Sequence, residues 1–81
     1  MIVRIERGQN AFWIDIDGKE MGVFEDVYID GESIKADTDW QAVYLDAVEV
    51  YIDSDAVFIR TVAGVMHDTL RSLIEVLKHE R

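Results

Sequence analysis

Residues 12–33 read FWIDIDGKEMGVFEDVYIDGES, and this stretch decides the fold because two Asp-Gly pairs divide it into runs of alternating apolar and polar residues. Alternation with a period of two is typical of a half-buried β-strand. Asp-Gly between two such runs is the strongest short signal for a hairpin, since a type I′ turn needs positive φ at both central residues. The stretch therefore predicts three antiparallel strands with turns at residues 17–18 and 30–31.

A two-residue turn also fixes which residues face each other across the hairpin. The pairs predicted for the first turn are Ile16 with Lys19, Ile14 with Met21, Phe12 with Val23 and Trp13 with Gly22. Those predicted for the second turn are Val27 with Ile34 and Asp26 with Lys35. In these pairs apolar residues largely meet apolar residues, and an aromatic ring can cover the bare glycine.

A third hairpin is predicted at residues 48–62, which read VEVYIDSDAVFIRTV. A turn centred on Ser54 and Asp55 places apolar residues opposite each other and an acid opposite a base. The predicted pairs are Ile52 with Val57, Tyr51 with Phe58, Val50 with Ile59 and Glu49 with Arg60.

The rest of the chain completes the predicted fold. Residues 1–7 alternate well enough for a further strand, whereas residues 37–47 fit a short helix and a strand equally well. Residues 65–79 carry apolar side chains at helical spacing. We therefore expect an α+β fold, with a four- to six-stranded antiparallel β-meander sheet and one C-terminal amphipathic helix packed on its apolar face, as a single domain over residues 1–81.

Composition limits the classes of protein to consider. The chain of 81 residues carries a formal net charge of −9 and contains no cysteine, which excludes disulfides and cysteine-based zinc sites. No apolar run approaches the roughly 18 residues needed to cross a bilayer, and the N-terminus does not resemble a signal peptide. We expect a cytoplasmic protein that does not associate with membranes.

The negative charge is concentrated in the predicted sheet. Residues 15–55 contain thirteen acidic residues against Lys19 and Lys35. If Met21, Val23, Val27 and Ile29 face the core, the alternation turns carboxylates and aromatic rings outward, with Glu25 as an exception near an edge or bulge. The predicted partner-binding residues are Trp13, Asp15, Asp17, Glu20, Phe24, Asp26, Tyr28, Asp30 and Glu32.

An acidic outer face has two interpretations. It can simply keep the protein in solution, because antiparallel sheets often leave one face in water. Aromatic anchors among carboxylates instead favour a binding surface for a basic partner. Direct binding to nucleic acid is not expected, since it requires a patch of lysine and arginine. The sharper hypothesis is a nucleic-acid mimic that engages a basic, nucleic-acid-handling protein, by physical analogy with phage-encoded inhibitors of host defence.

A structural subunit that acts through homo-oligomerisation is the alternative. Unpaired sheet edges favour self-association. Trp40, Tyr44 and the apolar face of the predicted helix would lie in such a homodimer contact.

Enzymatic and cofactor-dependent functions find little support in the sequence. No phosphate-binding glycine motif or nucleophile motif is present. Aligning either Asp-Gly glycine with the central glycine of an EF-hand loop places aromatic residues at ligand positions. Glu75 and His79 have metal-ligand spacing but supply only two ligands, so a solvent-facing helical pair explains them better. We expect no enzyme activity, no cofactor and no metal.

Overall fold

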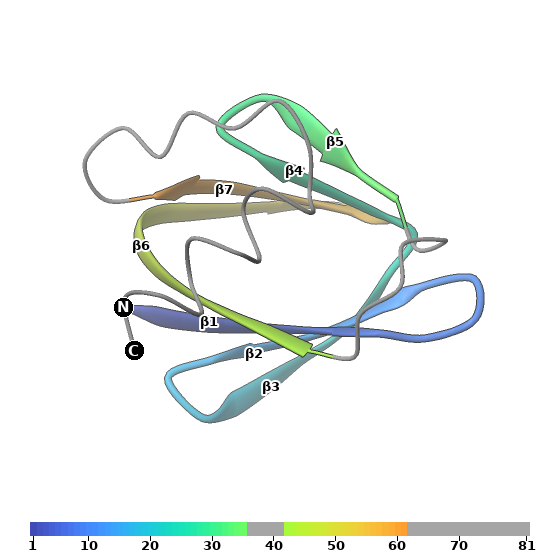
Figure 1. The fold of residues 1–81 in the computed structure, drawn as a ribbon, viewed down its shortest axis with the longest axis horizontal. Helices are drawn as coiled ribbons and strands as arrows, with labels where there is room; N and C mark the ends of the chain where they lie inside the picture. The colour runs from blue at the N-terminus through green and yellow to red at the C-terminus, as the bar shows by residue number, and fades with distance from the viewer. Residues whose placement is uncertain (36–41, 62–81) are drawn as a thin grey trace.

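A computed structural model describes residues 1–35 and 42–61, which form seven β-strands (Figure 1). The strands alternate buried and exposed residues along most of their lengths, as expected when one face covers a core. Their bounds are β1 (Ile2–Arg7), β2 (Phe12–Ile16), β3 (Lys19–Phe24), β4 (Asp26–Ile29), β5 (Glu32–Ile34), β6 (Ala42–Asp53) and β7 (Ala56–Thr61).

The strands form one sheet in the order β3-β2-β1-β6-β7-β4-β5, which folds over itself at β6. The first half of β6 pairs with β1 as far as Asp46, and the second half pairs with β7 from Ala47 onward, with a bulge at Val48 after the first pair of that ladder. The inner faces of both halves contribute to a single hydrophobic core. Its largest fully buried side chains are Phe12, Ile5, Ile14, Leu45, Ile59, Val3, Val27 and Val57.

The predicted fold class is wrong in two respects. The described sheet has seven strands rather than four to six, and it is mixed rather than a meander, because β4 runs parallel to β7. The described residues contain no helix, and the helix predicted for residues 65–79 lies outside them. In the ambiguous stretch at residues 37–47, the part from Ala42 onward is strand, since it alternates and lies between β1 and β7.

The predicted turns are confirmed. Asp17 and Gly18 have φ of 50° and 81°, and Asp30 and Gly31 have φ of 51° and 86°, as the type I′ geometry requires. Ser54 also has a positive φ, of 51°. All four pairs predicted for the third hairpin are present, as is the Val27–Ile34 pair of the second.

The register predicted for the first hairpin is wrong beyond its turn. Ile16 does face Lys19, but a bulge between Ile14 and Asp15 leaves Met21 as the extra residue and sets Phe12 opposite Phe24. Every residue from there to the end of β3 therefore changes faces. Phe24, predicted to point outward, is only 5% exposed, whereas Val23, predicted to lie in the core, is 48% exposed. Met21 is exposed as well.

A short break at Glu25 carries the chain from β3 in one half of the sheet to β4 in the other. The backbone amides of Glu25 and Asp26 both donate to the carbonyl oxygen of Asp55, at 2.8 and 3.3 Å. Glu25, predicted near an edge or bulge, therefore lies at a break between two strands. These bonds anchor the start of β4 beside the β6–β7 turn, where the parallel pairing with β7 begins.

Candidate functional site: an acidic and aromatic sheet face

Three aromatic residues on neighbouring strands form a row across the outer face of the second half of the sheet. Tyr51 of β6 lies opposite Phe58 of β7, and Phe58 lies beside Tyr28 of β4. The Tyr28 and Phe58 rings are stacked, with centroids 4.9 Å apart and planes 9° from parallel. The Tyr51 and Phe58 centroids are 5.9 Å apart with planes at 45°. The parallel pairing of β4 with β7 therefore adds the Tyr28 ring to the Tyr51–Phe58 pair of the β6–β7 hairpin.

Carboxylates lie on both sides of the aromatic row. On one side, Asp53 of β6 and Asp26 of β4 flank Ala56 of β7 in register. Alternation along the strands puts the next outward residues on the other side, two positions away and about 7 Å along each strand. They are Glu49, Arg60 and Asp30. We call these nine residues, which come from β4 and its following turn, β6 and β7, the acidic–aromatic face: Asp26, Tyr28, Asp30, Glu49, Tyr51, Asp53, Ala56, Phe58 and Arg60.

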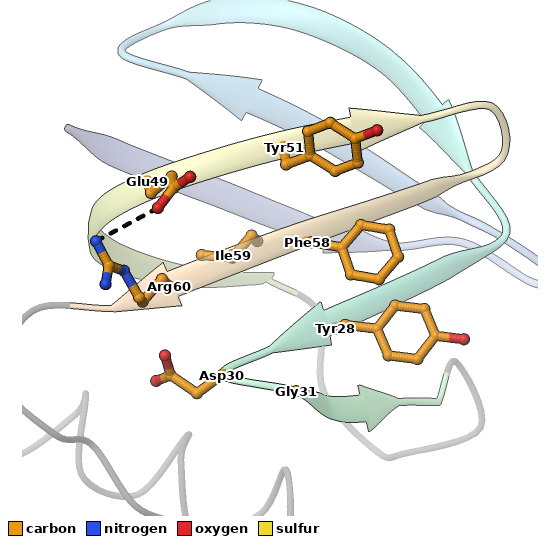
Figure 2. Close-up of a pocket in the computed structure, with 8 residues that line it drawn as sticks. All are labelled: Tyr28, Asp30, Gly31, Glu49, Tyr51, Phe58, Ile59 and Arg60. Carbon is orange, nitrogen blue, oxygen red and sulfur yellow. Dashed lines mark ion pairs between the residues drawn. The ribbon is translucent and has the colours of Figure 1, made fainter.

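An open pocket of about 380 Å³ lies on this face, between the aromatic rings and the Glu49–Arg60 pair (Figure 2). Its volume is within the range of about 300–1,000 Å³ found for small-ligand sites. Gly31 lies at its border, and a Cβ there would meet no atom within 4 Å, so this side of the pocket is open. The pocket is lined by Tyr28, Asp30, Gly31, Glu49, Tyr51, Phe58, Ile59 and Arg60.

The Glu49–Arg60 ion pair in the pocket is held loosely. Arg60 Nη2 lies 3.3 Å from Glu49 Oε2, and both side chains are about two-thirds exposed, at 64% and 65%. Exposed pairs of this kind contribute about 0.2–1 kcal/mol to stability. The pair can therefore open at little cost, which leaves the Glu49 carboxylate available to another cation.

Asp30 has a structural role as well as its place at the pocket. The Thr61 hydroxyl donates to Asp30 Oδ2 at 2.6 Å, and the Thr61 amide donates to Oδ1 at 3.3 Å. The Asp30 amide donates to the Ile59 carbonyl at 2.7 Å. The carboxylate thus fastens the β4–β5 turn to the end of β7 and helps to fix the edge of the pocket.

Asp17, in the equivalent turn of the other half, is used in the same way. The Ile2 amide donates to Asp17 Oδ1 and the Asp17 amide donates to the Ile2 carbonyl, both at 2.8 Å. The first residue of each Asp-Gly turn therefore binds a neighbouring strand, which limits its availability to a partner.

The structure divides the predicted partner-binding residues between two faces. The two halves of the sheet share one core between them, so their outer faces point away from each other. Asp26, Tyr28 and Asp30 lie together on the acidic–aromatic face. Glu32 is exposed at the β5 edge, opposite the inward-facing Ile29. Phe24 is in the core, and the remaining predicted residues belong to the first half: Trp13, Asp15, Asp17 and Glu20.

The outer face of the first half is more apolar and its charges are partly paired. Arg4 lies 3.3 Å from Glu6 and 3.7 Å from Asp15, and its guanidinium carbon is 5.9 Å from the centroid of the Tyr44 ring. This cation relieves the repulsion between Asp15 and Glu20, which face each other across β2 and β3. Trp13 and Val23, each about half exposed, lie opposite each other beside this group.

Sequence reasoning missed most of the acidic–aromatic face. The Tyr51–Phe58 and Glu49–Arg60 pairs were predicted as hairpin pairs, but nothing local to either segment indicates that β4 lies beside β7. The missing signal is the exposure of two aromatic residues, Tyr51 and Phe58, on a hairpin whose alternate residues are apolar. That pattern could have marked the hairpin as a binding surface.

The described residues contain no group of three or more histidine, cysteine, aspartate or glutamate side chains placed to hold a metal ion. Within residues 1–35 and 42–61 there is also no helix long and apolar enough to cross a membrane. No protein-family model, curated protein or solved structure matches the chain.

Proposed function

We propose that the protein is a small acidic binding module that engages a basic surface of a nucleic-acid-handling protein and regulates or inhibits that partner by occupying the surface. The observation that carries the proposal is the acidic–aromatic face, where four carboxylates surround a row of three aromatic rings. Exposed aromatic residues supply anchors for a protein interface, and surrounding charges provide complementarity and faster association.

The charge of this half of the sheet favours a basic partner over a nucleic acid. Among the described residues on β4, β5, β7 and the second half of β6, with their turns, seven are acidic: Glu25, Asp26, Asp30, Glu32, Glu49, Asp53 and Asp55. The basic residues of the same segments are Lys35, directly after β5, and Arg60, which is already paired with Glu49. Binding to phosphates requires several unpaired cations on one surface, whereas a protein that itself binds phosphates supplies the cations that this face lacks.

A chain without cysteine suits the reducing cytoplasm, where nucleic-acid-handling partners reside. We place the interaction there. The mode of action follows from the charge: carboxylates that take the place of phosphates block the partner's nucleic-acid site without base-specific contacts.

The test uses a variant that neutralises two acidic residues at one end of the face and one in the adjoining β6–β7 turn, Asp26→Asn, Asp53→Asn and Asp55→Asn. Immobilised wild-type protein is incubated with a DNA- and RNA-binding fraction of the native host's lysate. We expect capture of a protein that moderate salt or an added nucleic-acid duplex releases, and about tenfold less capture by the variant, because both steering and complementarity are weakened. Avoiding Asp30 keeps its bonds to Thr61 intact.

The matched control changes three acidic residues of the other half, Glu6→Gln, Glu20→Gln and Asp46→Asn, and thus alters net charge equally. It should capture the partner as well as wild type does. Equal losses in both variants, or capture that a nucleic-acid duplex does not compete with, would contradict the proposal. Concentration-dependent sedimentation with no captured partner would instead favour self-association, for which Trp13 and Val23 on the first half offer exposed apolar surface.

A further inference from the structure

The pocket on the acidic–aromatic face combines flat apolar walls with a carboxylate. The planes of Tyr51 and Phe58 diverge by 45°, so the rings leave a wedge between them rather than covering each other. The Glu49 side chain extends from the same strand as Tyr51, two residues away, at the opposite side of the pocket (Figure 2). A group that fits here must have an apolar, planar surface and a positive charge.

The other half of the sheet shows how this protein binds such a group. Arg4 is placed near the Tyr44 ring and pairs with the carboxylates of Glu6 and Asp15. In that setting the Arg4 side chain is 38% exposed. Tyrosine and carboxylate side chains on neighbouring strands thus form a site for a guanidinium group in this fold.

Arg60 does not fill the corresponding site on the acidic–aromatic face. Its side chain is 64% exposed, and within the described part of the chain its recorded partner is Glu49. Figure 2 shows it on the side of the pocket away from the rings. Within residues 1–35 and 42–61, no arginine therefore lies over these rings as Arg4 lies over Tyr44.

We infer that this pocket receives an arginine side chain of the basic partner protein, whose guanidinium lies against Tyr51 and Phe58 and displaces Arg60 from Glu49. The inference rests on the proposed function and names the group by which the partner is anchored. Arginine fits better than lysine because its guanidinium is planar, weakly hydrated and able to make two parallel bonds to a carboxylate. A phosphate is disfavoured because Glu49 and Asp30 both border the pocket.

Peptide titration of the isolated protein tests the inference without the partner. The probes are three short peptides that differ at one position, which is arginine, lysine or citrulline. All their other residues are uncharged, and citrulline is the neutral isostere of arginine. Amide and aromatic NMR signals report the site. We expect the arginine peptide to shift signals of Tyr51, Phe58 and Arg60, to bind about threefold more tightly than the lysine peptide, and to lose most of its affinity as citrulline.

Two substitutions separate this site from general attraction to an acidic protein. Glu49→Gln should weaken the affinity for the arginine peptide about fivefold, which corresponds to the largest free energies found for exposed ion pairs. The control Glu20→Gln, on the other half, should change this affinity little. Arg60→Gln should tighten binding, because it removes the internal competitor. Far-UV circular dichroism and thermal melting confirm that each variant is folded.

Equal affinity for the arginine and lysine peptides, signal changes spread over both halves, or weaker binding after Arg60→Gln would each overturn the inference. The last result would indicate an anion as the ligand. Peptide binding and partner capture can fail independently. Capture without peptide binding means that the partner uses another part of the face. Peptide binding without capture leaves the arginine site in place but removes its assignment to a nucleic-acid-handling protein.

Discussion

The two halves of the sheet share a core, a central strand and the same Asp-Gly turn, yet their outer faces differ. On the first half, Arg4 lies near the Tyr44 ring and pairs with Glu6 and Asp15, while Trp13 and Val23 beside this group are about half exposed. On the second half, Arg60 is exposed, and the three rings pack side by side on neighbouring strands. The fold does not require the exposed arrangement, because the first half achieves its pairing with the same residue types. The two outer faces therefore differ in how their arginines are placed, and the acidic–aromatic face carries the more exposed of the two.

The largest expected effect concerns the bulge that sets the faces of the first half. Phe24→Ala should lower the free energy of unfolding by about 3–5 kcal/mol, because it leaves a cavity in the shared core. Val23→Ala, one residue earlier on the outer face, should cost about 0.5 kcal/mol or less. Urea unfolding followed by Trp fluorescence measures both. A larger loss for Val23→Ala than for Phe24→Ala would mean that the hairpin pairs without the bulge.

An effect of intermediate size is expected when the two turn aspartates are replaced and the losses in stability are compared. Asp30→Asn should lower the free energy of unfolding by about 1–2 kcal/mol, because its bonds to Thr61 are partly buried and one of them is short. Asp17→Asn should cost about half as much, since its bond to the Ile2 amide is exposed. Asparagine tolerates positive φ, so both variants keep their turns. Equal losses in thermal unfolding would show that the turns themselves, rather than the carboxylate bonds, dominate.

The smallest effect is expected when the two arginines are replaced and the losses in stability are compared. Arg4→Gln should destabilise the protein by about 1 kcal/mol, because Asp15 then faces Glu20 with no cation beside it. Arg60→Gln should cost about 0.5 kcal/mol or less, since its pair with Glu49 is exposed. Repeating the denaturation at high salt should shrink the Arg4→Gln effect. If the two substitutions cost the same, the difference in exposure between the two arginines has no effect on the free energy of unfolding.

The sequence predicted local features of the fold well. The Asp-Gly turns and the register of the third hairpin follow from turn chemistry and from residues that face each other a few positions apart in the chain. The bulge was missed because alternation was extended through Gly22, whose φ of 123° is open to few residues other than glycine. A glycine inside a strand pattern is a known sign of a bulge, so this error could have been avoided.

The order of the strands in the sheet could not be predicted from patterns within short segments of the sequence. Pairing of β4 with β7 joins Tyr28 to Phe58 across thirty positions of sequence, and neither segment carries a turn or pattern that specifies the other. The candidate site depends on that pairing. The sequence could therefore indicate acidic and aromatic residues on an outer face, but it could not separate Trp13 and Asp15 on one side of the protein from Tyr28 and Asp26 on the other.

The order of strands in the sheet has a consequence for how the protein is made. A ribosome releases β1, β2 and β3 first and then β4 and β5, yet the two strands that join these pieces, β6 and β7, are the last of the described strands to emerge. Until then, β1 and β4 each lack their partner on one edge. The β6–β7 hairpin must insert between them to complete the sheet, and such long-range pairings close slowly, on the order of milliseconds to seconds. The acidic–aromatic face, built on that hairpin and β4, therefore comes into existence only after residue 61 has left the ribosome.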